Sequence, residues 1–351
     1  MEPVIKVIDE IISKEIDYTK NNLKEFEKDI KGKTFLVTGG AGFIGSWFCD
    51  ILVGFGANVI CVDNLLSGAN TNIRHLLKYD NFKFVNEDVC KFTFPENQEL
   101  DYIVHMASIA SPLSYLALPI ETLDANVIGT RRMLELAKEK KVKKFLFTGT
   151  SEVYGNPDDA HVPTAETYYG YVNSYGQRAV YDEGKRCAEA YCLAYLTKFK
   201  LPIRIVRIFN TFGPRLDIKS TTQYGRVIVK FISQALSGKP ITVYGDGTQT
   251  RSFCYITDQI EGLMKLLLLP KLDGEVVNIG NTEEVTVMEL AKRILKITNA
   301  NSHIGFHPLP PDDPRRRQPD LSKAKKLLNF SPRISLDEGL IRTVNWFKSM
   351  S

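Results

Sequence analysis

The sequence predicts an α/β protein built on a doubly wound parallel β-sheet, and two observations indicate this class. The first is the alternation of short apolar runs, which are typical of buried strands, with longer segments of helical periodicity. The second is a glycine-rich turn between the first predicted strand and the helix after it. With 351 residues, the chain is long enough for one large domain or two smaller ones with sizeable cores.

The glycine-rich turn follows the apolar run that ends at Thr38. Gly40, Gly42 and Gly45 have the G-x-G-x-x-G spacing of dinucleotide-binding loops, and Gly39 precedes them. One glycine permits the tight turn, one lets the backbone approach a pyrophosphate, and one lets the helix pack closely on the strand. The free N–H groups at the start of the helix suit an anion. The alternative interpretation is a purely structural turn.

A second predicted strand, Asn58–Asp63, ends in a carboxylate about 20 residues further on. An acidic residue at this position holds a ribose hydroxyl and disfavours the extra phosphate of NADP. This pattern predicts a Rossmann-type fold that binds NAD.

The alternation continues along the chain, and the carboxyl ends of parallel strands meet at one edge of a sheet, where ligands bind. The other predicted strands are Thr34–Thr38, Phe82–Asn86, Tyr102–His105, Phe145–Thr148 and Ile203–Ile208. The predicted helices include Thr122–Lys140, Asp182–Phe199, Val227–Leu236, Val287–Ile297 and Ser322–Leu328. After Asn210, glycine, proline and aromatic residues become frequent, which indicates a smaller α/β domain that closes over the sheet edge and binds the substrate in a cleft.

We therefore expect three parts. Residues 1–31 form an amphipathic helical extension, residues 32–209 a Rossmann domain with a return segment near 248–268, and residues 210–351 mainly a substrate-binding domain. In the extension, Ile5, Ile8, Ile12 and Ile16 recur at helical spacing, which predicts packing on the main domain or on a partner subunit. Its polar face carries as many acidic as basic residues, which argues against a membrane-surface helix.

Composition narrows the function classes. The net charge of +4 is mild, and the basic residues are scattered, so nucleic acid is not an expected partner. The six cysteines form no C-x-x-C pair, which favours reduced thiols over a metal site. The charged N-terminus is unlike a signal peptide, and no apolar stretch is long enough to cross a membrane, so we expect a cytoplasmic protein.

The chemistry is expected around Tyr181 and Lys185, which lie four residues apart on one predicted helix face. A nearby ammonium and a cationic nicotinamide favour the phenolate, which could act as a base. Thr150 and Glu152 follow the fifth strand and reach the same sheet edge, although a capping or surface carboxylate is the alternative for Glu152. His105 also lies at a strand end, but it lacks a paired carboxylate, and we interpret it as structural.

These motifs resemble the extended short-chain dehydrogenase/reductases that act on nucleotide sugars and, among them, the UDP-glucuronate decarboxylases. The resemblance spans nearly everything from Lys33 to Phe347. Its specific marks are Thr150-Ser151-Glu152-Val153-Tyr154-Gly155, Tyr181-Asp182-Glu183-Gly184-Lys185-Arg186, Arg207-Ile208-Phe209-Asn210-Thr211-Phe212-Gly213-Pro214 and Asp312-Asp313-Pro314-Arg315-Arg316-Arg317-Gln318-Pro319-Asp320.

The resemblance implies decarboxylation of UDP-glucuronate to UDP-xylose through a 4-keto intermediate, with NAD recycled. The implied catalytic residues are Thr150, Glu152, Tyr181, Lys185 and Arg317, of which Arg317 faces the substrate carboxylate. The implied cofactor contacts are Gly39, Gly42, Phe43, Ile44, Gly45, Asp63, Asn64, Asp88, Val89, Ala107, Tyr181 and Lys185. The implied substrate contacts are Tyr115, Glu152, Asn210, Arg226, Tyr244, Gln249, Arg251 and Arg317.

Two departures from the family pattern lie near the expected sugar site: Ile109 replaces a usual proline, and Ser174-Tyr175-Gly176-Gln177 replaces a proline-containing segment. The alternatives are a UDP-glucuronate 4-epimerase, another nucleotide-sugar 4-epimerase or 4,6-dehydratase, and a non-catalytic NAD-binding protein. The resemblance also implies a homodimer, paired through Thr122–Lys140 and Asp182–Phe199 as a four-helix bundle.

Overall fold

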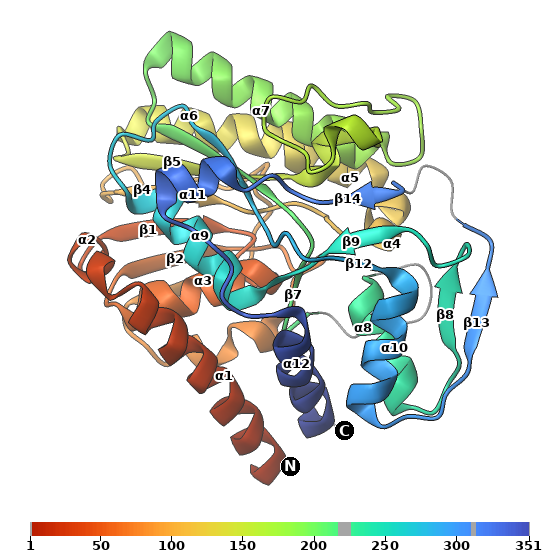
Figure 1. Cartoon of the computed structure of the whole chain (residues 1–351). Coiled ribbons are helices and arrows are strands. Elements are labelled where there is room, and N and C mark those ends of the chain that lie inside the picture. The colour runs from red at the N-terminus through yellow and green to blue at the C-terminus, as the bar shows by residue number, and fades with distance from the viewer. Residues whose placement is uncertain (1, 217–225, 310–313, 351) are drawn as a thin grey trace.

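A seven-stranded parallel β-sheet forms the centre of the structure, a computed structural model that describes residues 2–216, 226–309 and 314–350 (Figure 1). The strand order is β11-β6-β5-β4-β1-β2-β3. The strands are β1 (Thr34–Thr38), β2 (Asn58–Val62), β3 (Phe82–Val85), β4 (Tyr102–His105), β5 (Lys144–Thr150), β6 (Ile203–Ile208) and β11 (Val276–Ile279). The predicted doubly wound α/β class is confirmed.

Helices cover both faces of this sheet, which explains why its strands are apolar along most of their length. One face carries α5 (Pro119–Asp124), α6 (Thr130–Lys140) and α7 (Ala179–Phe199), and the other carries α3 (Phe43–Gly54), α9 (Ile256–Leu268) and α11 (Ser322–Leu328). Two separate apolar cores result, one on each side of the sheet.

The structure refines several predicted boundaries. Strand β5 runs two residues beyond the predicted end, so that Thr150 is its last residue. The predicted helix Thr122–Lys140 begins earlier, at Pro119, and a π-helical turn over Ala125–Gly129 separates α5 from α6. The strand β11 was not predicted, because the polar Asn278 interrupts its short apolar run, and it lies outside the return segment expected near 248–268.

In the described residues, the smaller part of the molecule contains three short sheets and the helices α8 and α10. Antiparallel and parallel pairing builds a three-stranded sheet in the order β12-β9-β14, while β13 pairs with β8 and β10 pairs with β7. The elements are β7 (Thr211–Phe212), α8 (Val227–Leu236), β8 (Ile241–Tyr244), β9 (Thr250–Ser252), β10 (Cys254–Tyr255), β12 (Glu284–Thr286), α10 (Val287–Thr298), β13 (Ile304–His307) and β14 (Arg316–Arg317). The Thr286 hydroxyl and the Glu289 carboxylate cap α10 reciprocally, which explains why this helix begins where it was predicted.

The two ends of the chain lie side by side as helices (Figure 1). The N-terminal α1 (Glu2–Asn22) packs against α3, α9 and α12 (Leu336–Met350), and the short α2 (Glu27–Ile30) and α4 (Pro112–Ala117) complete the fold. Ile12 is buried at this contact, and Glu15 pairs with Arg342 of α12 at 2.8 Å. The α12 helix was not predicted. None of the helices within the described ranges is long and apolar enough to cross a membrane.

Candidate active site

A cavity of about 1630 Å³ opens at the carboxyl ends of the parallel strands, where the smaller part of the molecule meets the large sheet. This is the edge at which doubly wound sheets bind ligands. Every predicted site residue lines this one cavity: Gly39, Gly42, Phe43, Ile44, Gly45, Asp63, Asn64, Asp88, Val89, Ala107, Tyr115, Thr150, Glu152, Tyr181, Lys185, Asn210, Arg226, Tyr244, Gln249, Arg251 and Arg317. The fold thus brings together residues that were predicted from widely separated motifs.

The glycine loop, Gly39–Gly45, has no room for side chains at two of its positions. Gly39 has a positive φ of 70°, and a Cβ there would lie 2.7 Å from the backbone N of Ala107. A Cβ on Gly45 would lie 2.2 Å from the carbonyl oxygen of Gly39. Backbone atoms cannot move aside as a flexible side chain can, so glycine is required if α3 is to begin this close to β1. Gly42 is the residue before α3, and the first residues of this helix line the cavity. The first N–H groups of a helix have no partner within it, and they suit an anionic diphosphate.

Asp63 follows β2, and two backbone N–H groups orient its carboxylate. Its Oδ2 accepts a hydrogen bond from the Ala41 N–H at 3.0 Å, and its Oδ1 accepts one from the Leu65 N–H at 2.8 Å. Burial raises the pKa of Asp63, while these backbone hydrogen bonds lower it. Each carboxylate oxygen has a second lone pair, so the side chain is oriented and can still accept a ribose hydroxyl. The loop and Asp63 together fit a dinucleotide with an unphosphorylated ribose.

Tyr181 and Lys185 lie on the first turns of α7, and both are buried. The Lys185 ammonium donates to the Thr148 carbonyl oxygen at 2.9 Å, and burial lowers its pKa to about 8. Burial also raises the pKa of Tyr181, while a hydrogen bond with Thr150 lowers it. Burial therefore favours the neutral phenol of Tyr181 in this structure, whereas the sequence predicted that Lys185 would favour the phenolate.

Two apolar neighbours hold the Tyr181 ring. Tyr115 stacks on it with ring centroids 5.4 Å apart and an interplanar angle of 9°. Ile109, the residue that replaces a usual proline, is buried in the same cluster. This departure from the family pattern thus lies in the apolar cluster that contains Tyr181.

Glu152 lies at the centre of a cluster of positive charge, which we call the guanidinium cluster: Arg178, Arg251 and Arg317. Arg178 Nη2 and Arg317 Nη2 both donate to Glu152 Oε2, the latter at 3.2 Å. Burial would raise the pKa of Glu152, but the charges of the three guanidinium groups outweigh it and hold the pKa at about 2. Glu152 is therefore ionised and paired, unlike the capping or surface carboxylate that was the alternative.

The three consecutive arginines before Gln318 have three different environments. Arg315 is exposed, Arg316 is about one-third exposed, and Arg317 is 2% exposed at the floor of the cavity. The Arg317 guanidinium donates to the carbonyl oxygens of Ser151 and Gly155 and to Glu152. A solvated basic run, the alternative interpretation of this segment, does not apply to Arg317.

Two residues near Glu152 were missed by sequence reasoning. Arg178 was not predicted as a site residue, and Asp182, four residues later on α7, approaches its Nε at 3.8 Å. The Oδ1 atom of Asp182 is buried and has no hydrogen-bond partner among the described residues. Burial, together with the nearby charge of Glu152, raises the pKa of Asp182 to about 7. Asp182 is part of the Tyr181 motif and Arg178 precedes it by three residues, so their place beside this motif is the signal that could have found them.

The remaining predicted substrate residues line the far wall of the cavity. Gln249 Nε2 donates to the Tyr244 carbonyl at 2.7 Å, and Lys230 Nζ donates to the Tyr244 hydroxyl at 3.1 Å. The Arg226 guanidinium lies 5.7 Å from the centre of the Phe43 ring, next to the glycine loop. Asn210 Nδ2 donates to the Ser252 carbonyl at 3.2 Å. This wall combines positive charge with amide and phenol groups, a set that suits a nucleoside diphosphate.

His105 does not line the cavity, although it ends β4. Its two ring nitrogens lie 2.7 Å from the Thr38 hydroxyl and 3.0 Å from the Thr130 hydroxyl. Burial lowers its pKa to about 3, so the ring is neutral at physiological pH. The structural interpretation of His105 is confirmed.

The comparison with known families agrees with this geometry. Residues 35–280 match the model of the NAD dependent epimerase/dehydratase family, which is more than half of the chain. The chain belongs to this family. The family description names NAD, and the glycine loop and Asp63 fit this cofactor.

Several curated proteins and solved structures resemble this family member over most of its length. UDP-glucuronic acid decarboxylase 1 of Danio rerio is 46% identical over 92% of the chain and 73% of its own length. UDP-glucuronic acid decarboxylase 6 of Arabidopsis thaliana is 44% identical over 91% of the chain and 89% of its own length. The structure of UDP-glucuronic acid 4-epimerase from Bacillus cereus, solved with UDP-glucuronic acid and NAD, is 31% identical with a TM-score of 0.80, covering 91% of this chain and all of its own.

Proposed function

We propose that this protein is an NAD-dependent UDP-glucuronate decarboxylase that forms UDP-xylose through a 4-keto intermediate. The observation that carries the proposal is the buried Arg317 guanidinium beside an ionised Glu152 at the floor of a cavity that also contains Tyr181. Relatives 44–46% identical over about nine-tenths of the chain bear the name of this activity, which supports the same conclusion.

The glycine loop and Asp63 would hold NAD, which would supply reversible hydride transfer at the sugar 4-position. Tyr181 would take the proton of the sugar 4-hydroxyl as the phenolate, the form that the positive charge of a bound nicotinamide would favour over the neutral phenol. Thr150, which hydrogen-bonds Tyr181, would hold the same sugar oxygen. The 4-ketone makes the 6-carboxylate part of a β-keto acid, whose carbon–carbon bond breaks to release carbon dioxide and leave an enolate. Thr150 and Tyr181 stabilise the oxygen on which the negative charge develops.

The guanidinium cluster accounts for the choice of an acidic sugar. Three guanidinium groups face one ionised carboxylate, Glu152, so the floor of the cavity carries an excess of positive charge. A second carboxylate, that of the substrate, therefore enters a favourable field. The family resemblance implies that Glu152 assists loss of the carboxylate or protonation of the carbon that carried it, and an ionised carboxylate can do so by positioning a water molecule.

The direct test is incubation with UDP-glucuronate and NAD, followed by measurement of carbon dioxide and of the nucleotide sugars. Carbon dioxide and UDP-xylose are expected in equal amounts, without accumulation of NADH. Formation of the 4-epimer with the carboxylate retained would instead assign a UDP-glucuronate 4-epimerase. Accumulating NADH would indicate release of the 4-keto product, and absence of any turnover would favour a non-catalytic NAD-binding protein.

We further propose a homodimer that pairs through the two long helical segments α5–α6 and α7 into a four-helix bundle. Exposed apolar side chains on these segments support the proposal: Ile120, Ile128 and Leu193 are 64%, 49% and 59% exposed. Leu193→Glu should shift the molecular mass measured by light scattering to that of a monomer. Ile341→Glu, which changes a residue of similar exposure on α12, should leave the mass unchanged.

The proposed compartment is the cytoplasm, on the ground that all six cysteines are unpaired, as in a reducing environment.

A further inference from the structure

We propose that Arg316 is a positioning residue that holds the Arg317 guanidinium opposite Glu152 and thereby sets the preference of the site for a sugar with a carboxylate. The inference rests on the proposed function, since it assigns Arg317 to the substrate carboxylate. Arg316 itself does not line the cavity.

The two arginines belong to the two-residue strand β14, which pairs in parallel with β9. The register places Arg316 opposite Thr250 and Arg317 opposite Arg251. Successive side chains of a strand point to opposite sides, so one arginine faces the cavity and its neighbour faces away from it. The exposures agree, because Arg317 is buried while the Arg316 side chain is 34% exposed.

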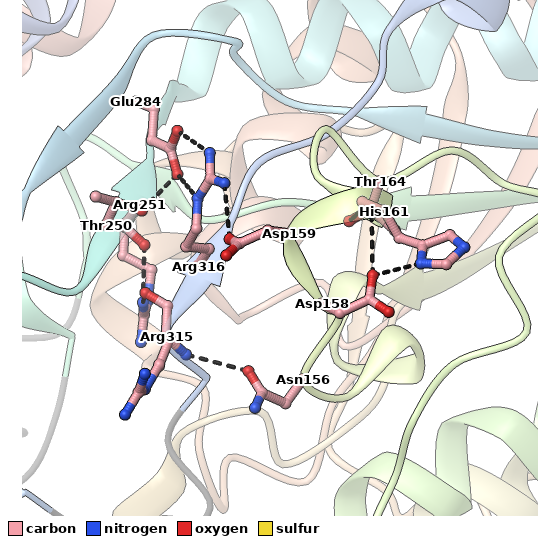
Figure 2. Close-up of polar contacts among 10 residues, drawn as sticks. All are labelled: Asn156, Asp158, Asp159, His161, Thr164, Thr250, Arg251, Glu284, Arg315 and Arg316. Atoms are coloured by element: carbon pink, nitrogen blue, oxygen red, sulfur yellow. Dashed lines mark hydrogen bonds and ion pairs between the residues drawn. The ribbon is translucent and has the colours of Figure 1, made fainter.

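On the side away from the cavity, Arg316 makes a clamp with two carboxylates (Figure 2). Its Nε and Nη2 donate to the two oxygens of Glu284 at 3.0 and 2.8 Å, in the bidentate arrangement that suits a guanidinium. Its Nη1 donates to Asp159 Oδ1 at 3.1 Å. The Thr250 hydroxyl donates to the same Glu284 carboxylate, which therefore ties β12, β9 and β14 together.

Asp159 belongs to the segment between Glu152 and Arg178, so its contact joins Arg316 to this second segment of the chain. This chain lies along β14: Asn156 Oδ1 accepts from the Arg315 N–H at 3.2 Å, and the Thr164 N–H donates to the Gln318 carbonyl at 2.8 Å. Asp158 caps the short helical turn that contains Asp159, as Figure 2 shows. Arg316 is thus joined both to the sheet that carries Arg317 and to the chain segment that begins at Glu152.

The two halves of the clamp are unequal. The Asp159 side chain is 88% exposed, and an ion pair at such a site contributes little. The Glu284 side chain is 18% exposed, and its hydrogen bonds with Arg316 are the largest of the effects that lower its pKa. Glu284 is therefore the partner that holds Arg316, and Asp159 only adds to it.

The experiment measures selectivity rather than activity alone. Binding of UDP-glucuronate and of UDP-glucose, which lacks the carboxylate, is compared in the full-length protein loaded with NAD, with Tyr181→Phe added to block turnover. Arg316→Ala should weaken UDP-glucuronate binding by about tenfold and UDP-glucose binding by less than about twofold, because only the former contacts Arg317. With Tyr181 intact, KM for UDP-glucuronate should rise more than kcat falls.

Companion variants separate the clamp from a general loss of structure. Glu284→Gln should reproduce most of the effect, Asp159→Asn little of it, and Arg316→Lys should lie between, since an ammonium cannot bind bidentately. Arg293→Ala is the matched control. Arg293 is also 34% exposed, pairs with Glu283 and Asp337 at 2.8 and 3.1 Å, and does not line the cavity, so selectivity should not change.

Equal weakening of both nucleotide sugars by Arg316→Ala and Glu284→Gln, or no change in either, would overturn the inference. Failure of the proposed function is a separate outcome, recognised when the unmodified protein releases no carbon dioxide from UDP-glucuronate. The binding comparison remains valid in that case, because it does not depend on turnover.

Discussion

The two ends of the cavity are built in different ways. The glycine loop is a single stretch of seven residues, Gly39–Gly45, in which backbone atoms pack so closely that Gly39 and Gly45 leave no room for a Cβ. The guanidinium cluster is assembled from side chains, and the contact between Glu152 and Arg317 joins residues 165 positions apart. The first end therefore depends on close backbone packing, whereas the second depends on balanced charges held by neighbouring elements.

This difference separates two kinds of sensitivity. A change at the glycine loop should act mainly on cofactor affinity, and a change in the guanidinium cluster should act on the acidic sugar. A change at Tyr181 should stop the reaction but leave the affinities for the cofactor and for the acidic sugar unchanged.

The largest effect is expected for Tyr181→Phe, which removes the hydroxyl and keeps the ring stacked on Tyr115. Turnover of UDP-glucuronate should fall by at least about 10³-fold, the scale of a lost general base. NAD affinity, measured by titration calorimetry, should change by less than about twofold, because the loss concerns proton transfer. Near-normal turnover would contradict the role given to Tyr181.

Arg317→Ala should come next. The variant removes the guanidinium proposed to bind the substrate carboxylate and leaves Glu152 less well compensated. Loss of one partner of a buried charge pair costs about 2–5 kcal/mol, and we expect a fall of roughly 10²- to 10⁴-fold in kcat/KM for UDP-glucuronate. NAD affinity should not change. Arg315→Ala, at the exposed position two residues earlier, should keep normal kinetics. A large loss of NAD affinity in the Arg317 variant would break the separation of the two ends.

Gly45→Ala tests the glycine loop. The added Cβ would lie 2.2 Å from the Gly39 carbonyl oxygen and 2.8 Å from the Gly40 Cα, so the backbone must shift. Overpacking of this kind costs about 1–3 kcal/mol, and we expect NAD affinity to fall by roughly 10- to 100-fold. Gly305→Ala is the control, because nothing lies within 4 Å of a Cβ there. Unchanged NAD binding in Gly45→Ala would show that the loop tolerates a side chain.

The smallest effect concerns the pH dependence of stability. The pKa of Asp182 is raised in the folded protein to about 7, above its ordinary value of 3.8, so the native state binds more protons than the unfolded chain between these values. The contribution of this group to stability is therefore lost as pH rises from about 4 to 7. The free energy of unfolding, measured with urea, should fall between pH 5 and pH 7 in the unmodified protein. In Asp182→Asn it should fall less, by an amount of the order of 1 kcal/mol. Equal losses in both proteins would mean that Asp182 is already ionised at pH 5.

Local sequence was sufficient for the cofactor end and for most of the large sheet. The six predicted strands occur in the structure within a few residues, because each is an apolar run between a glycine or polar turn and an amphipathic helix. The strand β11 and the helix α12 were missed. The polar Asn278 interrupts the apolar pattern of β11, and the apolar residues of α12 pack against α1, α8 and α10, which lie far from it in the sequence.

The amino-acid sequence by itself determined the class of fold, the glycine loop, Asp63 and the Tyr181 motif, because each is specified by residues close together in the chain. Only the tertiary structure decided the state of the charged groups. It showed that Arg315, Arg316 and Arg317 have separate environments, that Arg178 shares Glu152 with Arg317, and that the Lys185 ammonium is directed to a backbone carbonyl. Burial and the distance between charges control such groups, and both depend on segments that meet only when the chain is folded.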